Sequence, residues 1–162
     1  MKHPAELVGA GAPSEAARIE RMGACLASFF RYLYREVGRA YHWVDRLAWT
    51  DQQVRARLAD PDVTLHLLTF EGSPAGYFEL QKYPDGSVEV AYFGLLPEFL
   101  GRGLGKYLLT RAVSDAWELG ANRVWLHTCT LDDPAALPNY KARGFRPFKT
   151  EVYETALSAT TA

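Results

Sequence analysis

Apolar residues recur every three to four positions in two stretches of the chain, and this spacing predicts two long helices. The first helix is Ala24–Val37, which is followed by Gly38 as a stop signal. The second is Gly103–Leu119, which Gly120 ends. Its polar residues fall on one side and apolar residues cover the rest, so we expect it to pack closely against a sheet.

Two shorter helices are expected from their capping residues. Thr50 or Asp51 can cap a helix that runs to about Ala59, where an Asp-Pro pair ends it. The segment Pro134–Arg143 predicts the other short helix, with Asp133 as its cap.

Short apolar or alternating runs between the helices predict strands. The expected strands are Arg18–Met22, Val63–Phe70, Ala75–Tyr83, Val88–Leu96, Arg123–Thr128 and Phe145–Tyr153. The second, third and fourth runs are joined by short turns, one of them built on Asp85-Gly86, which favours an antiparallel meander. The order of helices, meander, helix, strand, helix and strand predicts an α/β (α+β) fold with one mixed sheet.

Composition places the chain among ordinary single domains. Its 162 residues, 48% of them hydrophobic, suffice for one core. We therefore expect one domain over residues 1–162, with residues 1–15 and 157–162 flexible. The net charge of -1 disfavours nucleic-acid and membrane-surface binding, and no apolar run reaches the roughly 18 residues of a membrane span. Cys25 and Cys129 have no metal-ligand spacing, so we expect no metal and a reducing, cytoplasmic location.

The segment Gly101–Lys106 carries the strongest chemical signal. It follows a predicted strand and opens a predicted helix, and three of its residues are glycines. The first N–H groups of a helix have no partner within the helix, and the helix dipole favours an anion beside them. A phosphate or pyrophosphate is the natural ligand. The spacing fits neither a dinucleotide-binding Rossmann fingerprint nor a P-loop.

A third pattern does fit. Val88–Phe99 together with the glycine loop resembles the fourth strand and loop of the GNAT superfamily of acetyl-CoA-dependent N-acetyltransferases. Asp133–Phe145 resembles the second signature of that family, which leads through a tyrosine, here Tyr140, to Gly-Phe. The two signatures stand in the family's order and cover about Val63–Tyr153 together with the elements between them. The resemblance implies a mostly antiparallel mixed sheet with splayed central strands and flanking helices, and direct acetyl transfer from acetyl-CoA to a primary amine.

Three residues depart from the family pattern. Leu100 replaces a Gln or Arg that adds a side chain to the phosphate site, and Asp133 replaces an Asn. Pro138 lacks an N–H inside the last helix, so that helix starts later than Pro134 or is kinked. These departures keep open an alternative from another class, a non-catalytic acyl-CoA-binding module.

The resemblance also implies where the coenzyme is held. Backbone groups along one strand should hold the pantetheine arm, and the Phe93 N–H could polarise the carbonyl. Gly94 is compatible with a bulge where this strand separates from the next. Backbone amides of the glycine loop should hold the pyrophosphate. The expected coenzyme contacts are Phe93, Leu95, Leu96, Gly101, Arg102, Gly103, Leu104, Gly105, Lys106 and Asp133.

Acetyl transfer to an amine needs a proton acceptor and a group that stabilises the leaving thiolate. By the resemblance, Glu89 is the first candidate for the base, directly or through water. Glu79 on the neighbouring strand and His127, whose titration range suits the role, are the other two. Tyr140 matches the family's general acid. A phenol with a pKa near 10 is a weaker acid than a thiol with a pKa of about 8.5, so we expect Tyr140 to stabilise charge by a hydrogen bond.

The resemblance further implies that the first two helices and their connection wall the acceptor pocket. The segment Phe29–Trp49 holds seven of the 21 aromatic residues of the chain, a composition that suits the wall of a small-ligand pocket. The candidate acceptor-binding residues are Tyr41, Trp43, Arg46 and Glu79. We expect a small-molecule or peptide amine as partner and a monomer or homodimer. A partner-binding domain that uses the aromatic segment is a further alternative.

Overall fold

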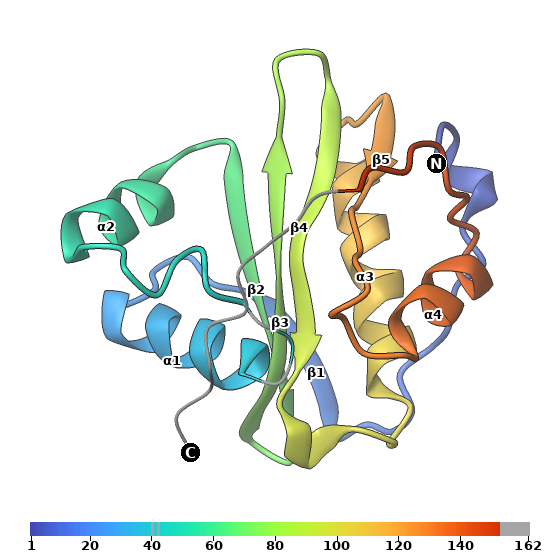
Figure 1. Ribbon diagram of the computed structural model, residues 1–162. Coiled ribbons are helices and arrows are strands. Elements are labelled where there is room, and N and C mark those ends of the chain that lie inside the picture. Colours follow the sequence, from blue (N-terminus) through green and yellow to red (C-terminus); the bar gives the residue numbers. More distant parts are fainter. Residues whose placement is uncertain (40, 42, 153–162) are drawn as a thin grey trace.

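The computed structural model describes residues 1–39, 41 and 43–152. Its elements in chain order are η1 (Pro4–Glu6), β1 (Ala17–Arg21), α1 (Ala27–Gly38), α2 (Asp51–Ala59), β2 (Val63–Phe70), β3 (Ser73–Lys82), β4 (Ser87–Leu95), η2 (Pro97–Phe99), α3 (Leu104–Glu118), β5 (Arg123–Trp125) and α4 (Ala136–Ala142) (Figure 1). Among the described residues, no helix is both long and apolar enough to span a membrane.

One five-stranded sheet organises the molecule, with its strands in sequence order from β1 to β5. The first four strands pair antiparallel, and β5 pairs parallel with β4. The parallel pairing is short, because it joins only Ser87–Glu89 to Arg123–Trp125. From Val90 onward β4 has no strand on this side within the described residues. The expected mixed sheet with a splayed central pair is therefore confirmed.

Helices cover both faces of the sheet. Figure 1 shows α1 and α2 on one face and α3 and α4 on the other. Two apolar cores result. The larger lies under α3 and includes Leu68, Phe78 and Leu108; the smaller lies under α1 and includes Leu33 and Tyr77. Burial of these side chains, each worth about 1.5–3 kcal/mol, fixes the two layers around the sheet.

The helix predictions hold with shifts at the N-termini. The α1 helix begins at Ala27, three residues later than expected, and α3 runs from Leu104 to Glu118. Thr50 caps α2 and forms a capping box with Gln53. The last helix, α4, begins at Ala136 rather than Pro134. This later start makes Pro138 the third helical residue, where a missing N–H costs no helical hydrogen bond.

The expected strand Phe145–Tyr153 is wrong for its described part, because residues 145–152 contain no strand. Residues 146–152 are exposed, and Pro147 among them cannot donate to a ladder. The outer edge of β5 is occupied instead by Met1, whose backbone exchanges hydrogen bonds with Val124 at 2.6 and 3.0 Å. β5 itself ends at Trp125 rather than Thr128. Tyr153 and the tail 157–162 lie outside the described residues.

The N-terminal segment also contacts the far end of the chain. The Val8 N–H donates to the Arg143 carbonyl at 3.1 Å, and the backbone of Glu6 lies against Gly144. We expected residues 1–15 to be flexible, and that flexibility stays a prediction. The contacts show that Met1–Val8 follows the outside of the α3 and α4 layer rather than extending from it.

The bulge expected at Gly94 lies three residues earlier. Glu79 pairs with Tyr92 and Leu80 with Val90, so Ala91 is the extra residue of β4. Gly94 pairs regularly with Tyr77. A Cβ on Gly94 would lie 2.4 Å from Val37 Cγ1, so the glycine is required because α1 packs directly on β4.

His66 makes the fold sensitive to acid. Its ring is buried between β2 and α3, stacks on Phe78 and lies 3.2 Å from Asp115, and burial, with the charges of Arg111 and Arg21, lowers its pKa to about 4. In the unfolded chain the His66 ring takes up a proton near pH 6.5, whereas in the folded chain it does so only near pH 4. The contribution of the neutral, buried ring to folding stability is therefore fully present above pH 6.5 and is lost as the pH falls toward 4.

We expect a loss of up to about 3 kcal/mol in unfolding free energy between pH 6.5 and pH 4 from this residue. The opposite effect of Asp115, whose pKa is raised by burial, reduces the net loss. Denaturant unfolding across this range checks it. His66→Gln should flatten the dependence, and the exposed His3→Gln should leave it unchanged. A wild-type curve that is already flat contradicts the prediction.

Candidate active site

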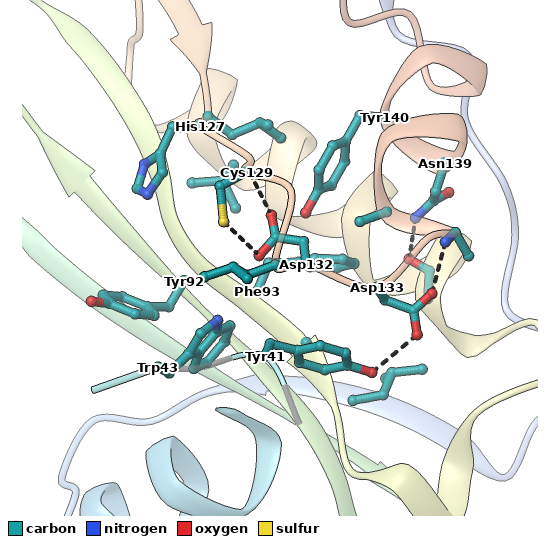
Figure 2. Close-up of a pocket in the computed structure, with 18 of the residues that line it drawn as sticks. Tyr41, Trp43, Tyr92, Phe93, His127, Cys129, Asp132, Asp133, Asn139 and Tyr140 are labelled. Atoms are coloured by element: carbon teal, nitrogen blue, oxygen red, sulfur yellow. Dashed lines mark hydrogen bonds between the residues drawn. The ribbon is translucent and has the colours of Figure 1, made fainter. Parts of the chain in front are cut away.

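A cavity of about 580 Å³ lies where β4 and β5 separate. It is lined by β4, the glycine loop and start of α3, the segment between β5 and α4, and the segment after α1. Figure 2 shows side chains from β4, the segment after α1, the segment between β5 and α4, and α4 itself converging on it. The predicted residues on its lining are Tyr41, Trp43, Phe93, Leu95, Gly101, Gly103, Gly105, Lys106, His127, Asp133 and Tyr140.

One wall of the cavity is the open edge of β4. The Leu96 N–H donates to the Ala75 carbonyl of β3 at 2.9 Å. Backbone N–H groups of successive strand residues point to opposite edges, so those of Phe93 and Leu95 point to the open edge. The expectation for Phe93 and Leu95 thus agrees with the geometry. Leu96 does not reach the cavity, because its N–H is used within the sheet and its side chain packs under α1.

The glycine loop and the start of α3 form one end of the cavity. Gly101 and Gly103 have φ values of 74° and 73°, in the left-handed region that favours glycine. Gly103 is the N-cap of α3, and no described side chain caps this turn. Gly105 and Lys106 line the cavity in the first turn of the helix. An oxyanion here would meet unpaired amides, the positive end of the helix dipole and one ammonium group.

Two predicted loop residues point elsewhere. The Arg102 guanidinium lies over the rings of Phe70 and Phe99, 5.6 and 5.3 Å from their centroids. Leu104 is fully buried in the core under α3. Neither side chain belongs to the cavity lining, so only their backbone groups are available to a ligand.

Glu89 and His127 form a pair at the end of the cavity remote from the glycine loop. Glu89 Oε1 lies 3.2 Å from His127 Nδ1, and the Tyr83 hydroxyl donates to Glu89 Oε2 at 2.7 Å. The carboxylate is buried, whereas the His127 side chain is 72% exposed and lines the cavity. With the Nδ1 proton directed at Glu89, Nε2 is the ring nitrogen with a free lone pair.

Glu89 and His127 each stabilise the charged form of the other. The hydrogen bond to Glu89 raises the pKa of His127 above its ordinary value, although partial burial opposes this. Burial would raise the pKa of Glu89, but the hydrogen bonds from His127 and Tyr83 outweigh it and hold the pKa below the ordinary value. Of these two candidate bases, His127 lines the cavity, whereas Glu89 is buried behind it and does not.

Tyr140 projects from α4 into the middle of the cavity (Figure 2). Only 8% of the residue is exposed, and its hydroxyl has no hydrogen-bond partner in the described part of the chain. Burial, with the charge of Asp132 adding to it, raises its pKa far above 10. The hydroxyl therefore stays protonated and is free to donate a hydrogen bond.

The acceptor side is walled by residues that follow α1. The Tyr41 hydroxyl donates to Asp133 Oδ2 at 3.1 Å and so joins this segment to the start of α4 (Figure 2). Burial and the Asp133 carboxylate raise the pKa of Tyr41 to about 12. Trp43 packs edge-on against Tyr92, 5.0 Å between centroids, and lies so close to Gly38 that a Cβ there would be 2.4 Å away.

Arg46 and Glu79, predicted to bind the acceptor, are not brought to the cavity. They form a buried bidentate ion pair at 2.6 and 2.8 Å, and Arg57 adds a second guanidinium to the same carboxylate. Glu79 is completely buried, which also removes it as a candidate base.

Sequence reasoning missed several residues of the lining. Cys129 and Asp132 lie on the segment between β5 and α4, and Asn139 of α4 donates to the Gly105 carbonyl at 3.5 Å. Tyr92 was missed too; it lines the cavity with its hydroxyl 3.4 Å from Asp45, a polar residue of the aromatic segment Phe29–Trp49. The alternation of side chains along β4 could have indicated Tyr92. Neighbouring strand residues face opposite sides of the sheet, so Tyr92 lies on the side that α1 covers and Phe93 on the other.

Comparison with known protein families decides what this site belongs to. The model of the Acetyltransferase (GNAT) family matches residues 28–145, which include the glycine loop and Tyr140. The chain belongs to the GNAT acetyltransferase family. No curated protein matches the sequence.

Solved structures share the fold of this GNAT chain at low sequence identity. An aminoglycoside acetyltransferase, meta-AAC0020, from an uncultured soil metagenomic sample superposes with a TM-score of 0.71 at 16% identity, over 91% of this chain and 100% of that one. The aminoglycoside N-acetyltransferase AAC(6')-Iy in complex with CoA gives 0.64 at 17% identity, over 86% and 94%. A ribosomal-protein-alanine N-acetyltransferase from Brucella melitensis biovar Abortus 2308 gives 0.65 at 15%, over 88% and 100%.

As a member of the GNAT family, the chain is an acyltransferase that uses acetyl-CoA as its acyl donor. The cavity fits such a donor. The open edge of β4 presents unpaired backbone donors, and the start of α3 presents uncapped amides for a diphosphate. Gly105 leaves room between these two: a Cβ there would meet only Leu95 Cδ1, at an ordinary 3.7 Å. Packing against the described residues does not require this glycine.

Gly105→Ala should therefore have opposite effects on the free protein and on its complex. Alanine is favoured over glycine in a helix, so the free protein should gain a few tenths to about 1 kcal/mol in unfolding free energy. The added methyl faces the ligand, and intrusion into a packed contact costs about 1–3 kcal/mol, so CoA affinity should fall by about tenfold or more. Gly23→Ala, in open space with ordinary φ, is the control. Unchanged affinity in calorimetry contradicts the prediction.

Proposed function

We propose that this protein transfers an acetyl group from acetyl-CoA directly to a primary amine of a small molecule or peptide. One observation carries the proposal: the Glu89–His127 pair presents a free ring nitrogen at the end of the cavity opposite the uncapped amides of α3. A ligand held by its diphosphate at one end thus has a candidate proton acceptor at the other.

His127 is proposed as the base. An ammonium acceptor must lose a proton before it attacks, and Nε2 can take that proton while Nδ1–H stays on the buried Glu89 carboxylate. The imidazolium that forms is stabilised by Glu89, which Tyr83 in turn holds in place. Glu89 and Tyr83 are positioning residues in this scheme, because they act through His127.

When bound, acetyl-CoA supplies a thioester carbonyl for attack and a thiolate leaving group. The Phe93 N–H, directed at the open edge of β4, can donate to an oxygen that gains negative charge. The Tyr140 hydroxyl, protonated and without a partner, can donate to a sulfur that gains negative charge. Lys106 and the amides at the start of α3 bind and orient the diphosphate. In this scheme, hydrogen-bond donors lie beside the atoms that gain negative charge.

The acceptor end favours amines that carry positive charge. Asp45 and Tyr92, 3.4 Å apart, line this end together with Trp43, and the Asp132 carboxylate also lines the cavity. Carboxylates and aromatic faces both attract ammonium groups. The fold neighbours include acetyltransferases of aminoglycosides and of a ribosomal-protein alanine, so this fold accommodates both small polyamines and peptide amines.

The test is amine-dependent release of free thiol from acetyl-CoA, with the product identified by mass spectrometry. The acceptor panel should contain aminoglycosides, linear polyamines and peptides with a free α-amine. We expect saturable turnover for at least one class and an increase of one acetyl group in its mass. Saturable acetyl-CoA binding by calorimetry without thiol release on any acceptor class would favour the non-catalytic acyl-CoA-binding module instead.

A further inference from the structure

A thiol that the proposed chemistry does not use lies inside the coenzyme cavity. Cys129 is exposed, belongs to the cavity lining, and projects toward its centre beside Asp132 and Tyr140 (Figure 2). Its segment is held in place by Asp132, whose carboxylate accepts hydrogen bonds from the Thr128 hydroxyl at 2.7 Å and the Cys129 N–H at 3.0 Å. The position of the thiol is therefore set by the loop.

A second observation marks this place as a ligand site. Tyr140 is more than nine-tenths buried, its hydroxyl is without a partner in the described residues, and it points into the same space. The hydroxyl oxygen opens onto the cavity, so its proton is available to an atom of a ligand. Figure 2 shows Cys129 and Tyr140 between the Asn139 end of the cavity, which adjoins the glycine loop, and His127.

That order locates the sulfur of the coenzyme. The diphosphate end lies at the start of α3 and the proton acceptor lies at His127, so the thioester sulfur belongs between them, where Cys129 and Tyr140 project. This placement rests on the proposed function. It brings two sulfur atoms, one from the chain and one from the coenzyme, into one part of the cavity.

We propose that Cys129 is a modification site that forms a mixed disulfide with CoA. The reactant is the symmetrical disulfide of CoA. The Cys129 sulfur attacks one sulfur of that disulfide, a new S–S bond to CoA forms, the original S–S bond breaks, and the second CoA leaves as a thiolate that takes the proton of Cys129. The exchange conserves the number of disulfides, so no further oxidant is needed.

Recognition of the nucleotide, rather than an activated thiolate, makes the reaction selective. The Cys129 Sγ lies 3.9 Å from Asp132, and no cationic group in the described part of the lining lies against it. A small disulfide without a nucleotide has no diphosphate by which the cavity could hold it. CoA disulfide is held at the cavity by its diphosphate, and this proximity raises the effective concentration of its sulfur.

The adduct has a functional consequence. A CoA moiety tied to Cys129 occupies the cavity that acetyl-CoA must enter, so the modified protein is inactive. A thiol reductant cleaves the mixed disulfide and restores the site. The cavity thus contains a reversible redox block that responds to the ratio of oxidised to reduced CoA.

The experiment treats the reduced full-length chain with CoA disulfide or, at equal concentration, glutathione disulfide, and follows adducts by intact mass and peptide mapping. We expect one CoA per chain, on Cys129, formed about tenfold faster or more than the glutathione adduct. Acetyl-CoA should protect and dithiothreitol should reverse the adduct. Cys129→Ser should abolish it. Cys25→Ser should not, because Cys25 lies outside the cavity and burial raises the pKa of its thiol.

Two readouts separate this inference from the proposed function. Binding of acetyl-CoA to the untreated protein and thiol release with an amine test the function alone. If both succeed while CoA disulfide modifies Cys129 no faster than glutathione disulfide does, or modifies Cys25 instead, the inference is overturned and the function stands. Fast, acetyl-CoA-protected modification of Cys129 supports the inference even where no acceptor amine has been found.

Discussion

Replacement of His127 by alanine is expected to lower kcat by about 100-fold or more, since a positioned general base contributes typically 10²–10⁴-fold. Acetyl-CoA affinity should be unchanged, because the proposed coenzyme contacts are at the start of α3 and along β4, away from this side chain. Free-thiol release under saturating amine measures the first quantity and calorimetry the second. The exposed His3→Ala is the matched control and should keep full activity.

The pH profile distinguishes a base from a merely structural histidine. Only the neutral imidazole accepts a proton, so activity should rise with pH through a pKa above 6.5, the direction in which Glu89 shifts His127. Glu89→Gln removes the negative charge, so the rising limb should move to lower pH, while kcat at high pH falls because the imidazole is a weaker base. The titration of the amine is common to all variants and cancels in the comparison.

Two outcomes would contradict this scheme. If His127→Ala keeps most of its activity while Glu89→Gln loses it, Glu89 is itself the base, through water. If both variants keep the profile of the wild type, neither residue accepts the proton. Tyr83→Phe should have the smallest effect of the set, because it removes one hydrogen bond to Glu89 and leaves the charge in place.

The sequence predicted those parts of the site that depend on backbone geometry. A strand followed by a glycine-rich helix start specifies open amides, and the structure places Gly101, Gly103 and Gly105 at the cavity as expected. The splayed strands could be expected from the family resemblance. The position of the bulge could not, because Gly94 serves the packing of Val37 rather than the bending of β4.

Contacts between side chains that are far apart in the sequence could not be predicted from the spacing of residues along the chain. Arg46 is a predicted acceptor contact because it belongs to the aromatic segment, and Glu79 is a predicted site residue because it lies on the strand next to Glu89. Their pairing is fixed only when the segment after α1 folds over β3. The expected last strand is wrong in its described part for a similar reason. A strand there would need a free edge of the sheet to pair with, and the outer edge of β5 is already hydrogen-bonded to Met1.

The buried ion pairs of Glu79 with Arg46 and Arg57 should make a large contribution to folding stability. Glu79→Gln should lower the unfolding free energy by about 3–5 kcal/mol, because it leaves buried guanidinium groups without their counter-charge. Glu79 is 0% exposed, and Arg46 and Arg57 both bond to it. The Arg46 guanidinium also lies 4–6 Å from four aromatic ring centroids, those of Phe30, Tyr34, Trp49 and Tyr92.

The loss of unfolding free energy should depend on how exposed the removed ion pair is. Glu98→Gln removes an ion pair with Arg39 at the surface, where both side chains are at least half exposed, and should cost less than about 1 kcal/mol. Denaturant unfolding of both variants at one pH gives the comparison, and equal losses would show that burial does not control the energy of the Glu79 pair. The loss should also reach the site. Arg46 anchors the segment that carries Tyr41 and Trp43, so Glu79→Gln should raise the KM for the amine more than the KM for acetyl-CoA.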